Sequence, residues 1–169
     1  NPASGINPFT LANCADLGDV SPNPVDLEDS MDRVASFFKN LQKRNIIPMT
    51  AGGDHLISLP ILRGLVAAKP LAMIHFDSHT DLFDSYFGGF KYTHGTPFRR
   101  AIEEGLLDPK RVVQIGIRGT AYNLDDIEWG EAQGVRIVRV EELFDRGIES
   151  VMEEALSLIH ISEPTRPVP

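Results

Sequence analysis

The chain has 169 residues, of which 42% are hydrophobic and 24% charged, a composition typical of one globular domain with a real core. Its formal net charge of −8 disfavours a nucleic acid or an anionic membrane as a partner. The single cysteine excludes an internal disulfide and fits a reducing compartment, and no apolar run reaches the roughly 18 residues of a membrane span. We therefore expect a cytoplasmic protein that binds neither nucleic acid nor membrane.

The first part of the chain predicts a loop-rich start followed by alternating helices and strands. Residues 1–22 are rich in Pro, Asn, Gly and Asp, which favours loop, with Leu11–Leu17 as a candidate short strand. Apolar residues at three- and four-residue steps then predict an amphipathic helix that begins at Pro24, with Asn23 as its N-cap, and ends near Asn45. The next predicted elements are a buried strand, a helix and a second buried strand, at Ile46–Ala51, Leu56–Ala68 and Leu71–Phe76.

The second part continues the alternation after a long loop at residues 77–93. We predict a helix from Thr96-Pro97 to Gly105, a strand at Arg111–Ile117, a helix at Leu124–Gln133, a strand at Val135–Val140 and a helix at Glu141–Leu156. Strands that are continuous apolar runs and alternate with helices are typical of a parallel sheet covered on both faces. The sequence therefore predicts an α/β fold of three layers, α/β/α, with a mainly parallel sheet.

Acidic and imidazole side chains directly follow two of the predicted strands. Asp77, His79 and Asp81 stand at alternate positions after Leu71–Phe76, and His55 ends the run Ala51-Gly-Gly-Asp-His55. Ligand sites in such folds lie at the carboxyl ends of strands, and carboxylate oxygen with imidazole nitrogen favours Mn²⁺, Fe²⁺ or Zn²⁺ over Ca²⁺ or Mg²⁺. Each residue by itself could be a helix cap, a turn former or a polar core residue, but the joint set favours a cation.

The backbone must curl after Phe76 for these side chains to converge. Fully extended, Asp77 to Asp81 would span about 13 Å, whereas paired metal ions lie roughly 3.5–4 Å apart. Gly52-Gly53 would permit an unusual turn that brings His55 in from the neighbouring strand end.

Three motifs resemble those of the ureohydrolases, the family of arginase, agmatinase and the guanidino-acid hydrolases. They are Gly52-Gly53-Asp54-His55, Asp77-Ser-His-Thr-Asp81 and His94-Gly-Thr-Pro-Phe-Arg-Arg100, while residues 103–110 and 114–119 resemble the agmatinase branch. The resemblance covers about residues 10 to 155. It implies an arginase/deacetylase-like three-layer fold, truncated here, with two Mn²⁺ ions in each intact active site.

The resemblance also implies a role for each matching residue. His55 and Asp81 would bind the first ion, His79 the second, and Asp77 would bridge both. His94 matches the family's acid/base histidine outside the metal shell, and Asp54 resembles a turn residue rather than a ligand. The implied reaction cleaves a linear guanidino compound, agmatine or a guanidino acid, to urea and an amine, with the full-length protein assembled as a trimer or hexamer.

One departure from the family pattern concerns the remaining ligands. The family supplies two more metal-binding Asp residues from a later Asp-x-Asp motif, and a substrate-binding Glu beyond it, and no such motif follows residue 119. We therefore expect this chain alone to bind Mn²⁺ weakly and to be inactive. Two alternatives stay open: a degenerate subunit that only assembles with active partners, and a zinc-dependent deacylase on the related fold.

The last residues differ in character from the rest. The stretch Leu156–Arg166 resembles the translated read-through of a sequencing adapter, and Pro164, Pro167 and Pro169 fall within the last six residues. We expect a partial ureohydrolase domain at residues 1–156 and a non-native tail at residues 157–169, the alternative being a genuine Pro-rich tail. His160 is left out of any site for this reason.

Overall fold

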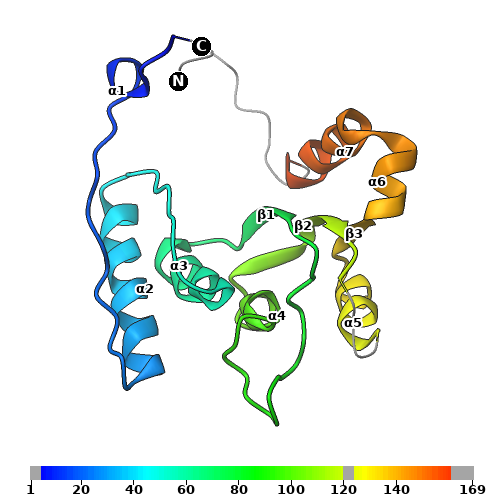
Figure 1. Ribbon diagram of the computed structural model, residues 1–169, viewed down its shortest axis with the longest axis horizontal. Coiled ribbons are helices and arrows are strands. Elements are labelled where there is room, and N and C mark those ends of the chain that lie inside the picture. Colours follow the sequence, from blue (N-terminus) through cyan, green and yellow to red (C-terminus); the bar gives the residue numbers. More distant parts are fainter. Residues whose placement is uncertain (1–4, 120–123, 161–169) are drawn as a thin grey trace.

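Three parallel strands form the centre of the computed structural model, which describes residues 5–119 and 124–160 (Figure 1). The strands are β1 (Leu71–Phe76), β2 (Leu107–Ile117) and β3 (Arg136–Arg139), in the order β1-β2-β3. All pair in parallel; Ile74 lies opposite Val113, and Ile115 opposite Val138. Parallel pairing requires a crossover between successive strands, and helices provide it here.

The helices surround the sheet on both faces (Figure 1). Their bounds are α1 Pro8–Leu11, α2 Leu27–Lys43, the 3₁₀ helix η1 His55–Ile57, α3 Ser58–Leu65, α4 Pro97–Glu103, α5 Asp125–Gln133, α6 Val140–Arg146 and α7 Ile148–His160. None of the helices in the described ranges is long and apolar enough to cross a bilayer.

Two hydrophobic clusters lie on opposite faces of the sheet. On one face Leu59 of α3, Phe98 of α4 and Ile127 of α5 pack with Val112 and other residues of the larger cluster. On the other face Val151 and Ala155 of α7 pack with Val113, Ile115 and Val138. Adjacent residues of β2 thus face opposite layers, as the two-residue period of a strand requires. The three-layer α/β/α architecture predicted from the sequence is confirmed.

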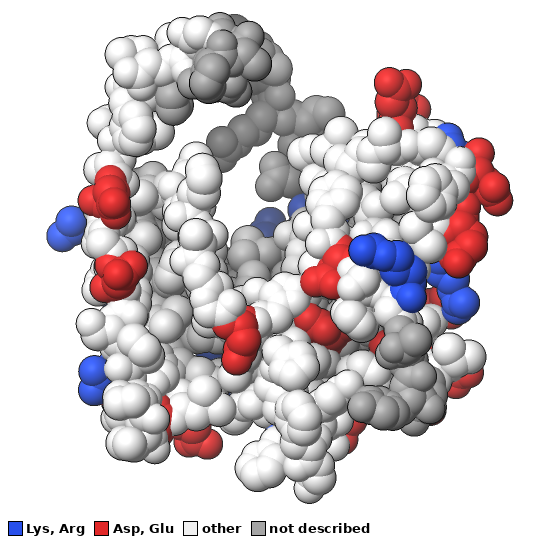
Figure 2. All heavy atoms as spheres, in the orientation of Figure 1, with Lys and Arg blue, Asp and Glu red and all other residues white. Residues whose placement is uncertain are grey.

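The α6–α7 side carries a network of ion pairs. Arg136 Nε lies 2.6 Å from Glu154, and its guanidinium also pairs with Glu142. Arg146 contacts the same two carboxylates, at 2.7 Å and 2.5 Å. Figure 2 shows basic and acidic side chains close together at this end of the molecule. The network ties β3 to both helices.

The strand predicted at Ile46–Ala51 is wrong. These residues adopt no regular structure, and the side chains of Ile47 and Met49 are 95% and 94% exposed. A strand exists only where its backbone finds a hydrogen-bonded neighbour, and within the described residues this segment pairs with neither edge of the sheet. Leu11–Leu17 is no strand either, because residues 8–11 form the short helix α1 and residues 12–17 are irregular.

The remaining differences concern where elements begin and end, and one of them is that β2 begins at Leu107 rather than at Arg111. Asp26, not Asn23, caps α2, because its carboxylate accepts the backbone N–H of Asp29 at 3.0 Å. The last predicted helix is two helices separated at Gly147, whose φ of +78° suits glycine. The second of them, α7, extends to His160 rather than ending at Leu156; residues 161–169 of the predicted tail lie outside the described residues.

Candidate metal centre

The backbone curls immediately after β1, where the sequence predicted that it must. The N–H of Asp77 still donates to Ile115 O of β2, at 3.2 Å. The next carbonyl, that of Ser78, accepts the N–H groups of both Arg118 and Gly119, at 2.9 Å and 2.6 Å. Asp81 then has a φ of +51°, in the left-handed region, which turns the chain back toward α4.

His55 enters the site from the start of η1. Gly53 has a φ of +46°, which favours glycine. The carboxylate of Asp54 accepts the backbone N–H of Leu56 at 2.8 Å and so caps η1. Asp54 is thus the turn residue that the resemblance implied, and the cap holds His55 at the first position of the helix.

The structure brings all four predicted metal-binding residues together. His55 Nδ1 lies 2.5 Å from Asp81 Oδ2 and 3.5 Å from Asp77 Oδ2. His79 is on the other side of Asp77: its backbone N–H donates to Asp77 Oδ1 at 2.9 Å, and its ring Nδ1 lies 3.8 Å from the same oxygen. Asp81 is buried, Asp77 is partly exposed, and the His79 side chain is 53% exposed.

The neighbours of these groups shift their pKa values in opposite directions. The hydrogen bond to Asp81 raises the pKa of His55 against the effect of burial, and the charges of Asp81 and Asp77 add to the rise. Burial works against the charge of Asp77, but the backbone N–H of His79 and the charge of His75 together hold the pKa of Asp77 below its usual value. Both shifts reflect the attraction between the imidazole of His55 and the carboxylates beside it.

These residues fit a divalent transition-metal ion. Ligand atoms of His55, Asp77 and a third residue, His75, all lie within 4.8 Å of one another. Carboxylate oxygens with imidazole nitrogens are a donor set that suits Mn²⁺ or Zn²⁺. A dication bound here would be held by the ring of His55 and by the carboxylates of Asp77 and Asp81.

His75 did not feature among the predicted site residues. It is the fifth residue of β1 and only 7% exposed, and its pKa is lowered by burial and by the nearby His55. The two-residue period of a strand was the available signal, because it places His75 on the same face as Asp77. Phe98 of α4 packs against both imidazoles, with ring centroids 5.1 Å from His55 and 4.5 Å from His75.

The predicted acid/base residue His94 lies in the loop before α4. His94 is exposed, and its ring makes an edge contact with Tyr86 and a tilted contact with Phe87, at centroid distances of 5.6 Å and 5.8 Å. Gly95 packs against Phe83 and Tyr86, so the aromatic side chains of this loop lie next to His94.

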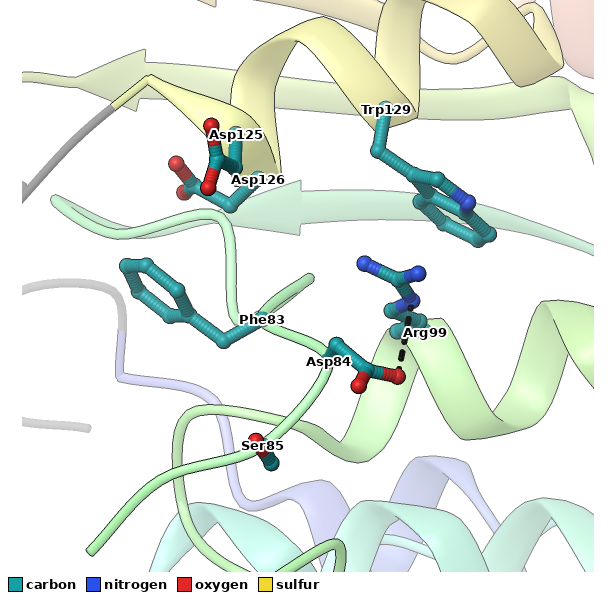
Figure 3. A pocket seen from close by; sticks show the side chains of 7 residues that line it. All are labelled: Phe83, Asp84, Ser85, Arg99, Asp125, Asp126 and Trp129. Atoms are coloured by element: carbon teal, nitrogen blue, oxygen red, sulfur yellow. Dashed lines mark ion pairs between the residues drawn. The ribbon is translucent and has the colours of Figure 1, made fainter. Parts of the chain in front are cut away.

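A separate cavity of about 540 Å³ lies beside the same loop (Figure 3). Its lining includes Phe83, Asp84, Arg99 and Trp129, with the Arg99 guanidinium 4.4 Å from the centre of the Trp129 ring. Asp126 also lines it and accepts a hydrogen bond from the Thr80 hydroxyl, which fastens the 77–81 turn to α5. None of the four predicted metal ligands lines this cavity, so the cavity is separate from the candidate metal centre.

Comparison with known proteins gives concordant matches. The Arginase family model matches residues 1–167. A guanidinopropionase from Pseudomonas aeruginosa is 49% identical over 156 residues, which are 92% of this chain and 49% of that protein. A mitochondrial guanidino acid hydrolase from Homo sapiens is 43% identical over 155 residues, or 91% of this chain and 44% of its own length.

A solved structure extends the comparison to the fold. The proclavaminate amidino hydrolase from Streptomyces clavuligerus superposes with a TM-score of 0.78 at 34% identity, over 92% of this chain and 52% of that one. The chain thus spans about half the length of the relatives it matches.

Proposed function

Because the chain belongs to the arginase family, we propose that it forms part of the active site of a ureohydrolase that cleaves a linear guanidino compound to urea and an amine. The observation that carries the proposal is the contact of His55 with the carboxylates of Asp77 and Asp81. These residues come from two motifs that are more than twenty positions apart, and both motifs resemble those of the family. An assembly-only subunit would have no need of this convergence.

We propose two Mn²⁺ ions as the cofactor, which His55, Asp77, His79 and Asp81 would help to hold. Such ions supply a water-derived nucleophile near neutral pH. The chain's own residues prepare the site: the contacts of Asp77 with the N–H of His79 and with His55 favour its charged form, which a cation requires. An imidazole nitrogen of His94 would deliver the proton that the leaving amine needs.

A short guanidino acid is the substrate class to test first, with agmatine as the comparison. The names of the relatives support this order, since guanidinopropionase, guanidinobutyrase and guanidino acid hydrolase all denote action on guanidino acids. An agmatinase from Gallus gallus is similarly related, at 42% identity, which keeps agmatine in the panel. We propose a cytoplasmic protein of trimeric or hexameric assembly when the chain is part of a protein of the relatives' length.

Mn²⁺ binding by the 169-residue chain tests the proposal directly. Titration followed by electron paramagnetic resonance should show weak binding that Asp77→Asn lowers about tenfold or more, because that change removes the bridging charge. Asp145→Asn, on the exposed surface of α6, is the matched control and should bind as the parent does. Absence of any Mn²⁺ binding, or equal binding by Asp77→Asn, would contradict the proposal.

Activity is tested in a protein of the relatives' length that contains this chain. Urea release should occur from guanidino acids or agmatine, and His94→Ala should lower turnover while leaving the bound Mn²⁺ unchanged. Turnover equal to the parent's would remove His94 from the mechanism. A preference for Zn²⁺ with release of an acyl group would instead favour the deacylase alternative.

A further inference from the structure

His75 and Gln114 form a buried polar pair directly behind Asp77. The two residues are register partners on β1 and β2, and Gln114 is fully buried. The amide nitrogen of Gln114 lies 3.1 Å from Nδ1 of His75 and 2.6 Å from the backbone carbonyl of Thr80. Neither residue belongs to the predicted metal ligands, and buried polar groups normally need a defined hydrogen-bonding arrangement.

The orientation of Gln114 determines which nitrogen of His75 carries hydrogen. A backbone carbonyl can only accept, so the group that faces Thr80 O must be the NH₂ of the amide. Its second hydrogen then points at His75, whose Nδ1 must be an acceptor without a proton. A neutral imidazole with an unprotonated Nδ1 carries its hydrogen on Nε2.

Nε2 of His75 is buried and has no hydrogen-bond partner of ordinary geometry among the described residues. The carboxylate oxygen Oδ2 of Asp77 lies 3.4 Å from it. Hydrogen bonds at catalytic sites are often long in the unbound protein and tighten when the site is filled. The carboxylate of Asp77 is therefore the acceptor toward which this N–H is directed.

We propose that His75 is a positioning residue, which donates from Nε2 to Asp77 and is itself held by Gln114. This inference rests on the proposed function for its role at a metal centre, but its hydrogen-bond pattern can be tested without metal. The chain of contacts would fix the rotation of the Asp77 carboxylate, leaving Oδ1 to the N–H of His79. It also connects that carboxylate to Thr80, and so to the curl itself.

The same arrangement argues against His75 as a metal ligand, although its position beside His55 and Asp77 would allow it. To bind an ion through Nε2, a neutral His75 would need its hydrogen on Nδ1. That hydrogen would then oppose the NH₂ group of Gln114, donor against donor. The orientation of Gln114 therefore favours a positioning role for His75 over a role as a metal ligand.

The tautomer of His75 is the first measurement. A long-range ¹H–¹⁵N correlation spectrum of the labelled, metal-free chain distinguishes the two neutral tautomers and the charged ring, and His75→Gln identifies the signal. The expected result is a neutral ring with hydrogen on Nε2. Hydrogen on Nδ1, or a charged ring at mildly alkaline pH, would overturn the proposal whether or not the chain binds Mn²⁺.

A pair of substitutions then tests the role. His75→Gln keeps an N–H donor at about the reach of Nε2, whereas His75→Leu removes it. With folding checked by circular dichroism, His75→Leu should weaken Mn²⁺ binding about tenfold or more, and His75→Gln should restore most of the loss. Equal binding by His75→Leu and the parent would overturn the positioning role, while a parent that binds no Mn²⁺ would instead refute the proposed function.

Discussion

The contact between α2 and α3 leaves no room for a side chain at Gly64, which gives the structure a quantitative test. A Cβ there would lie 2.5 Å from the carbonyl oxygen of Ala35, 2.7 Å from Cβ of Phe38 and 2.9 Å from the nitrogen of Lys39. Most of these atoms are backbone and cannot rotate away, so α3 must move by several tenths of an ångström. Overpacking of this kind costs about 1–3 kcal/mol, while alanine regains up to about 1 kcal/mol of helix propensity. Gly64→Ala should therefore lower the free energy of unfolding by about 1–2 kcal/mol.

Urea unfolding of the 169-residue chain measures this loss, with Gly130→Ala as the matched control. Gly130 also lies inside a helix, but the atoms nearest to a Cβ there would be the ends of side chains, Cδ1 of Leu82 at 2.6 Å and Cδ1 of Ile137 at 3.4 Å, with Cβ of Val135 at an ordinary 3.8 Å. Those methyl groups can shift, so the control should lose less stability. If Gly64→Ala unfolds at the same urea concentration as the parent, or a higher one, α2 does not pack against α3 as described, and the support of the helix that follows His55 must be reconsidered.

Two further predictions follow from other parts of the structure. At Gly119 a Cβ would collide with the ring of His79. Gly119→Ala should therefore weaken Mn²⁺ binding about tenfold with little change in circular dichroism. Unchanged binding would mean that Mn²⁺ binding does not need the present position of the His79 ring. In the α6–α7 network, hydrogen bonds from Arg136 lower the pKa values of Glu142 and Glu154 below 4.5. The ion pairs of these two carboxylates therefore stabilise the fold above about pH 4.5, and this stability is lost as the pH falls through the lowered pKa values. Arg136→Leu should thus cost ~1 kcal/mol at neutral pH in urea unfolding and progressively less in acid; a pH-independent difference would contradict this assignment.

Local patterns predicted the elements whose partners are nearby in the chain. A helix that buries one stripe shows an apolar residue every three or four positions, as Leu27–Lys43 does. A strand that is buried on both faces shows a continuous apolar run, as β1 and β2 do. Ile46–Ala51 has the same apolar signature and yet forms no strand. Apolar composition makes a segment suitable for a sheet, but the backbone hydrogen bonds come from a neighbour that composition does not specify.

Spacing predicted the residues of the site better than it predicted their surroundings. The alternation of Asp77, His79 and Asp81 predicted the curl after Phe76, and the glycines before His55 predicted its approach; the structure contains both, although His55 comes from η1 and not from a strand end. The contact between Thr80 and Asp126 was not foreseen, because it joins residues 46 positions apart and Asp126 resembled an ordinary helical carboxylate. Contacts such as this one depend on how distant elements pack, and a short sequence motif carries no information about that packing.

The order of residues along β1 shows why the supporting groups are nevertheless close in sequence to the ligands. A strand that ends in a ligand presents, two residues earlier on the same face, a side chain at the bottom of the site. His75 is buried at that depth, and its two ring nitrogens face Gln114 and the carboxylate of Asp77. An apolar residue at the same position would leave the carboxylate of Asp77 with the N–H of His79 but without a donor toward Oδ2. We therefore propose that His75, two positions before Asp77, sets the orientation of that carboxylate, and the comparison of His75→Leu with His75→Gln separates this role from simple packing.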